Sequence, residues 1–211
     1  MTKSNDPDNS VRRRIEAAFT AREEDQSFER ALGRFMIAWA DAEAELYRVL
    51  VYYSQVSDPV ARALFSGTRA KGMMDFIKSI AHNTALASDR REDLEYVFSQ
   101  MSTINAMRDH VVHHASDSYS YDDPKKRIVA NTRASRYGNA KGYEVGVEAI
   151  DTMTWDLYGI ANHLNMHWGP REGNFRPWRE NYEDQAPTPW AYKPLQPIAS
   201  WEQSPSNPKS K

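Results

Sequence analysis

One amphipathic segment limits the possible folds of this chain more than any other feature. Residues 27–53 read SFERALGRFMIAWADAEAELYRVLVYY, and their large apolar side chains recur three or four residues apart, or at multiples of those spacings. This periodicity is typical of an α-helix that buries one face. It predicts a helix over 27–54 with Ser27 as its N-cap. The apolar positions are Phe28, Leu32, Phe35, Trp39, Leu46, Leu50 and Tyr53.

Weaker patterns of the same kind predict the remaining elements. Between the last two helices, KRIVANT and YEVGVEAI flank a glycine-containing turn region and predict a β-hairpin over about 126–148. We therefore expect an all-α fold: a four- to five-helix bundle with a β-hairpin inserted before the last core helix. The other expected helices are 10–24, a short one after residue 57, 69–84, 89–115 and 151–168.

The length of 211 residues predicts one domain with appendages. We expect a disordered N-terminus over 1–9, the helical domain over 10–168 and a tail rich in Pro and Trp over 169–211. Two alternatives are open for the tail, because its composition is typical of disorder while its tryptophans are costly to leave in water. It is either disordered or extended across the bundle.

Composition excludes several classes of protein. There is no cysteine, so disulfides and thiolate metal sites are absent. The N-terminus lacks the apolar region of a signal peptide, and no stretch is apolar enough to cross a membrane. We expect a cytoplasmic protein without membrane association. The formal net charge of −2 means that nucleic-acid binding requires a local basic patch. The one candidate patch follows residue 124 and includes Lys125, Lys126, Arg127, Arg133 and Arg136.

Half of the six histidines lie in MRDHVVHHASD, residues 107–117. Three interpretations are open. His110 and His114, or Asp109 and His113, lie four residues apart on a helix, and either pair could supply two ligands for a metal ion, with His163 or His167 as the third. Alternatively, the cluster is a solvated helix end, where the helix dipole favours imidazolium. The third interpretation is acid–base chemistry by an R-x4-H pair.

The R-x4-H pair consists of Arg108 and His113, and its arginine occupies an apolar-stripe position. A charge at such a position is rarely there for packing alone. The pattern F-x3-W-x3-E-x2-L, which begins at Phe35, followed by a helix that ends in MRDHVVHH, resembles the HEPN superfamily over about residues 26–168. HEPN domains are helical bundles with an R-x4-6-H signature and a polar residue after the arginine. Here that residue is Asp109, and Ala115 replaces the tyrosine of one toxin branch.

The resemblance implies a metal-independent endoribonuclease that acts as a homodimer, in a toxin–antitoxin or defence setting, with no cofactor. Arg108 would stabilise the phosphorane, His113 would transfer protons, and Asp109 would orient the imidazole. Glu43 would pair with Arg108, and His110 would support the site. The basic patch would bind RNA, and an antitoxin or other protein is a possible partner. The alternative is a non-catalytic HEPN-like module that binds a protein or a nucleotide.

Overall fold

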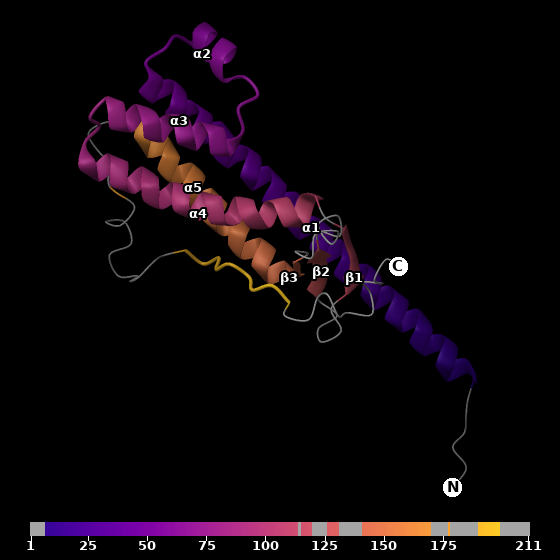
Figure 1. The fold of residues 1–211 in the computed structure, drawn as a ribbon. Helices are drawn as coiled ribbons and strands as arrows, with labels where there is room; N and C mark the ends of the chain where they lie inside the picture. Colours follow the sequence, from indigo (N-terminus) through magenta and orange to yellow (C-terminus); the bar gives the residue numbers. More distant parts are fainter. Residues whose placement is uncertain are drawn as a thin grey trace, which may run out of the picture.

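The computed structural model has the predicted fold class, a mainly α-helical bundle with a small antiparallel sheet before the last helix (Figure 1). It describes residues 7–113, 115–119, 126–130, 141–169, 177 and 190–198. The elements in these ranges are α1 (Pro7–Ser54), α2 (Asp58–Phe65), α3 (Ala70–Asn83), α4 (Ser88–His113), β1 (Ala115–Tyr119), β2 (Lys126–Ala130), β3 (Gly142–Gly146) and α5 (Val147–Trp168).

Helix α1 is one continuous helix where the sequence predicted two. The expected break at Ser27 was wrong. Residues 20–32 contain no proline or glycine that would break a helix. Asp25 and Ser27, inside the helix, each cost only a fraction of a kcal/mol, roughly up to 0.7. Figure 1 shows the N-terminal part of α1 extending beyond the rest of the bundle.

The core lies where α1 packs along α5, with α3 against α1 and α4 against both α3 and α5. Five apolar side chains of the predicted helices 27–54, 89–115 and 151–168 belong to one hydrophobic cluster, as expected for helices that each bury one face. They are Trp39, Leu46, Met101, Ile104 and Leu157.

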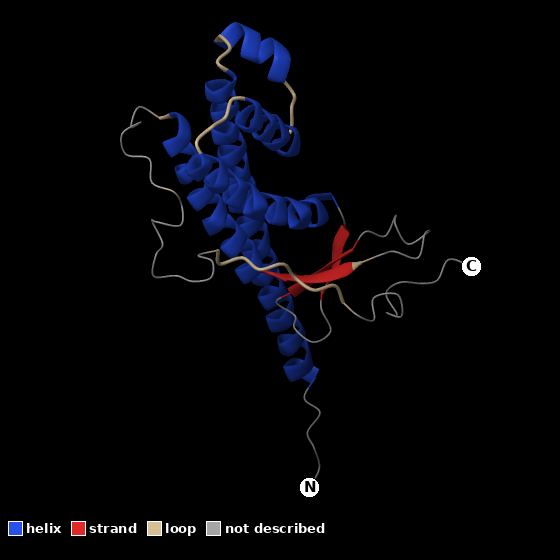
Figure 2. Ribbon diagram, turned by 60° about the vertical axis from the view of Figure 1, so that its left-hand side comes forward, coloured by secondary structure: helices blue, strands red, loops and turns tan. Residues whose placement is uncertain are grey.

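The predicted hairpin is confirmed by β2 and β3, which pair antiparallel from Lys126 opposite Gly146 to Ala130 opposite Gly142. A third strand, β1, pairs with the other edge of β2 and was not predicted (Figure 2). Its sequence, ASDSY, is rich in residues that favour turns, so its strand conformation depends on pairing with β2. The sheet directly follows the C-terminal end of α4.

Part of the tail, residues 190–198, is extended and lies against the bundle (Figure 1). Trp190 and Tyr192 belong to the core cluster, and the Trp190 ring stacks on Tyr96 of α4 with ring centroids 5.5 Å apart. The Ile198 N–H donates to the Gly142 carbonyl over 2.8 Å, at the open edge of β3. These nine residues of the tail are therefore extended across the bundle and are not disordered. The other tail tryptophans, Trp178 and Trp201, lie outside the described residues.

Candidate functional site

The C-terminal end of α4 carries the predicted catalytic arginine, partly covered by core residues. The Arg108 guanidinium lies 5.1 Å from the centre of the Trp39 ring, and its Nη1 donates to Asp109 Oδ1 over 3.0 Å. Its side chain is 21% exposed. A cation over the face of a tryptophan is attracted by the ring quadrupole. This contact explains how an arginine fits a position in an apolar stripe.

Glu43 has a polar partner, but the partner is not Arg108, with which the resemblance implied a pair. Its Oε1 accepts from the backbone N–H of Ala70, the first residue of α3, over 3.2 Å. The N-cap residue of α3, Arg69, makes no side-chain capping bond. Glu43 supplies the acceptor that the cap lacks, and a carboxylate there also interacts favourably with the helix dipole. The expected Glu43–Arg108 pair was therefore wrong.

The histidines at the C-terminal end of α4 differ in exposure and in their contacts. His113 is the last residue of α4 and is exposed. The His110 ring packs on Tyr143 of β3, with centroids 4.6 Å apart, which ties the helix end to the sheet. His114, the other half of the possible metal pair, lies outside the described residues. Residues five apart on a helix point about 140° apart, so Arg108 and His113 of one chain face different directions.

The basic patch is divided between the two faces of β2. The Arg127 guanidinium lies 4.8 Å from the centre of the Phe28 ring on α1, so it is part of the packing between sheet and helix. Lys126 faces the other way and lines a cavity. The remaining predicted RNA-binding residues, Lys125, Arg133 and Arg136, lie outside the described residues.

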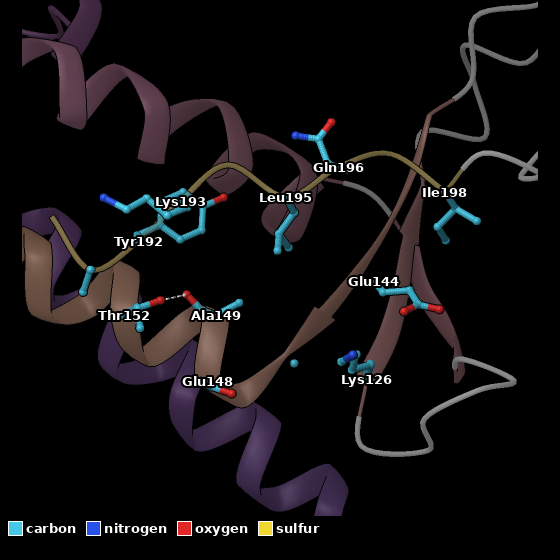
Figure 3. A pocket seen from close by; sticks show the side chains of 12 residues that line it. Lys126, Glu144, Glu148, Ala149, Thr152, Tyr192, Lys193, Leu195, Gln196 and Ile198 are labelled. Carbon is cyan, nitrogen blue, oxygen red and sulfur yellow. Dashed lines mark hydrogen bonds between the residues drawn. The ribbon is translucent and has the colours of Figure 1, made fainter. Parts of the chain in front are cut away.

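That cavity, of about 590 Å³, lies between β2, β3, the first turns of α5 and the tail segment (Figure 3). Lys126 and Lys193 line it together with Glu144 and Glu148. Two cations balanced by two carboxylates do not favour a phosphate over a neutral ligand. The cavity therefore gives little support to RNA binding by itself.

A second group of polar side chains, buried at the other end of α4, was not predicted as a unit. Asp93 lies near the start of α4, while His163 and His167 lie near the end of α5. Asp93 Oδ2 accepts from His163 Nε2 over 2.5 Å and from His167 Nε2 over 2.9 Å. Tyr53, at the end of α1, lies with its hydroxyl 2.9 Å from His167 Nδ1. The group therefore joins three helices.

Burial shifts the pKa values of two members of this group, His167 and Tyr53. It lowers the pKa of His167, and the nearby Asp93 carboxylate opposes this only in part. It also raises the pKa of the Tyr53 hydroxyl, so the phenol keeps its proton. Assigned from these bonds, His167 is neutral: its Nε2–H donates to Asp93, and its Nδ1 accepts from Tyr53.

One sequence feature points to the buried group of Asp93, His163 and His167. His163 and His167 are four residues apart on a predicted helix and therefore share a face. The sequence predicts them only as alternative third ligands for a metal ion at residues 109–114. In the structure they contact Asp93, fifteen residues before Arg108 on the same helix, or about 22 Å along its axis. Asp93 lies in the charged stretch RREDLEY and resembles a solvated helix start, so only burial distinguishes it.

No protein-family profile, curated protein or solved structure matches the chain. The HEPN resemblance therefore rests on the residues quoted above. Within the described ranges, no helix combines the length and apolar character that crossing a membrane requires.

Proposed function

We propose that this protein is an HEPN-type, metal-independent endoribonuclease that cleaves RNA as a homodimer. One observation carries the proposal. At the Arg108 end of α4 two buried donors, Arg108 Nε and Trp39 Nε1, have no hydrogen-bond partner among the described residues. Buried donors are nearly always paired, and exceptions often mark functional positions. An exposed imidazole, His113, lies five residues away at the same helix end.

These two side chains suit RNA cleavage. An imidazole can accept the proton of the 2′-hydroxyl or donate one to the leaving 5′-oxygen. The planar guanidinium of Arg108 offers paired donors to the extra negative charge of the phosphorane. The contact with Trp39 limits the positions that the guanidinium can take, which reduces the entropy lost when it binds the phosphate.

The directions of Arg108 and His113 make a second copy of the chain part of the proposal. Because they point about 140° apart, one chain does not readily place both on one phosphate. A two-fold axis near the end of α4 would place Arg108 of one protomer beside His113 of the other.

Cleavage of total RNA in EDTA tests the function. The wild type should produce fragments that end in a 2′,3′-cyclic phosphate. Arg108→Ala and His113→Ala should each slow cleavage by about a hundredfold or more. His82→Ala is the matched control, because His82 is also an exposed histidine in the last turn of a helix, α3. Cleavage that survives in His113→Ala, or that disappears in His82→Ala, would contradict the proposal.

Mixing the two inactive variants tests the dimer. Random exchange of protomers makes half of the dimers mixed, and each mixed dimer has one intact composite site of two. Activity should therefore recover to about a quarter of the wild-type value. If the mixture stays inactive while light scattering shows exchanged dimers, the two residues act within one chain or not at all.

The alternative, a non-catalytic binding module, is favoured by a different part of the surface. Two adjoining hollows of about 650 and 630 Å³ beside α1 and α2 share Tyr47 and Arg62, and Trp168 lines one of them. Aromatic rings beside an arginine suit a nucleotide base and its phosphate. Calorimetric titration with nucleotides, with Arg62→Ala beside the wild type, tests this module. An unchanged affinity in Arg62→Ala would exclude the hollows.

A further inference from the structure

The buried group at the start of α4 has the composition of a metal site. Asp93, His163 and His167 each offer one ligand atom, and these atoms lie within 4.8 Å of one another. Their side chains are between 0% and 2% exposed. Two imidazoles and a carboxylate form a common set of protein ligands for zinc. The donor set and the close approach of its ligand atoms make this group a candidate for binding an ion.

The distances decide whether an ion fits. Nitrogen and oxygen ligands lie about 2.0–2.2 Å from Zn²⁺, so two of them at a tetrahedral centre are about 3.4 Å apart. In the structure Asp93 Oδ2 lies 2.5 and 2.9 Å from the two Nε2 atoms. Outward movements of less than about 1 Å therefore make room for the ion.

We propose that Asp93, His163 and His167 bind one divalent transition-metal ion, with Zn²⁺ the first candidate, which joins the start of α4 to the end of α5. The inference does not depend on the proposed nuclease function, because Arg108 lies about 22 Å farther along α4. Imidazole ligands select Zn²⁺, Co²⁺ or Ni²⁺ over Mg²⁺ and Ca²⁺, which prefer oxygen. A water molecule or the second oxygen of Asp93 completes the coordination.

Tyr53 fits the role of a residue that orients a ligand. An ion at His167 Nε2 replaces the proton there, and the neutral ring then carries its proton on Nδ1. The Tyr53 hydroxyl, 2.9 Å from that nitrogen, can accept a hydrogen bond as readily as it donates one. Zinc-bound histidines almost always have such a partner on the second ring nitrogen, and its loss typically weakens binding by about 10–100-fold.

Arg90 is a cation whose charge acts on this group. It lies three residues before Asp93 on α4, and its charge affects both Tyr53 and His167. Two like charges near one carboxylate repel each other. We therefore expect Arg90→Gln to bind Zn²⁺ more tightly than the wild type.

Metal titration of the full-length, untagged chain tests the proposal. After removal of metal with a chelator and dialysis, native mass spectrometry with added Zn²⁺ should show one ion per chain. Asp93→Asn and His167→Gln should weaken binding, measured against a chromophoric chelator, by about a hundredfold, and Tyr53→Phe by about tenfold. His82→Gln and His113→Gln, which change exposed histidines, should bind as the wild type does.

Binding of Co²⁺ to the wild type tests the proposal without a substitution at any metal-binding residue. Cobalt in the wild type should show the intense visible absorption of a tetrahedral ion, which excess Zn²⁺ should remove. The proposal is overturned if the wild type binds no stoichiometric metal. It is overturned equally if His82→Gln or His113→Gln abolishes binding. Where a ligand variant fails to fold, Tyr53→Phe and the cobalt spectrum decide.

Discussion

The two ends of α4 satisfy their polar groups in opposite ways. At the start of the helix, Asp93 is buried and accepts hydrogen bonds from two histidines of α5. At the other end, Arg108 pairs with its exposed neighbour Asp109 and retains a buried Nε without a described partner. His113, the last residue of the helix, faces solvent.

This difference separates two uses of polar side chains on a single helix. A closed group such as that around Asp93 stabilises one arrangement of helices, and removing one member leaves the others unpaired in the core. We expect the open group, Arg108 and His113, to contribute less to stability, and it is the group that the proposed nuclease function uses. Stability and activity measurements should therefore respond at opposite ends of the helix.

The largest effect on stability is expected at the closed end. Asp93→Ala leaves two buried N–H donors without an acceptor, at about 1–3 kcal/mol each, so the free energy of unfolding should fall by about 2–6 kcal/mol. Asp109→Ala removes a carboxylate that is 54% exposed and should cost less than about 1 kcal/mol. Urea denaturation in EDTA measures both. Similar losses in the two variants would contradict the contrast between the two ends.

The middle of α4 has a third polar group, which resembles the closed end. Asp156 of α5 accepts from the Gln100 side chain over 2.7 Å and from the backbone N–H groups of Ala191 and Tyr192, each over 3.1 Å. Desolvation raises the pKa of Asp156, against these hydrogen bonds. One carboxylate thus fastens the tail segment to the bundle.

The raised pKa predicts how stability depends on pH. The folded protein binds a proton at Asp156 more readily than the unfolded chain, whose carboxyl has the ordinary value of 3.8. The contribution of Asp156 to stability is therefore fully present below that value and is lost as the pH rises through the folded-state pKa. The wild type should lose stability relative to Asp156→Asn over this interval. Denaturation of both proteins from acid to neutral pH measures it, and a constant difference would contradict the shift.

The fold could be predicted where side chains repeat with a period. The stripes that contain Trp39, Met101 and Leu157 gave the correct buried faces, because burial of one face imposes the helical period on the sequence. Strand β1 and the continuity of α1 through Ser27 could not be predicted. Both depend on weak local preferences that pairing or helix propagation overrides.

The residues of the candidate sites could also be predicted only where a local sequence pattern marks them. Arg108 was found because a charge interrupts an apolar stripe, which is a local signal. Asp93 was missed because its burial depends on α5, seventy residues later in the chain at His163. The predicted partner of Glu43 was wrong for the same reason, because only the folded chain brings the N-terminus of α3 to this carboxylate.

The contact between Glu43 and the start of α3 predicts a moderate loss of stability when Glu43 is replaced. Glu43→Ala removes the acceptor that caps α3 and should lower the free energy of unfolding by about 0.5–2 kcal/mol. Because Glu43 and Arg108 do not pair, the losses in Glu43→Ala and Arg108→Ala should add to within about 0.5 kcal/mol in the double variant. A larger coupling energy would restore the pair that the sequence predicted.

The smallest effect on stability is expected at His113. The side chain is exposed at the last residue of α4, so His113→Ala should change the free energy of unfolding by no more than about 0.5 kcal/mol. His110→Ala should cost more, because its ring packs on Tyr143 of the sheet. If His113 acts on RNA, the variant that unfolds like the wild type is the one that loses cleavage. A His113→Ala protein that is both inactive and strongly destabilised would mean that this residue supports the fold, and the open end of α4 would then resemble the closed one.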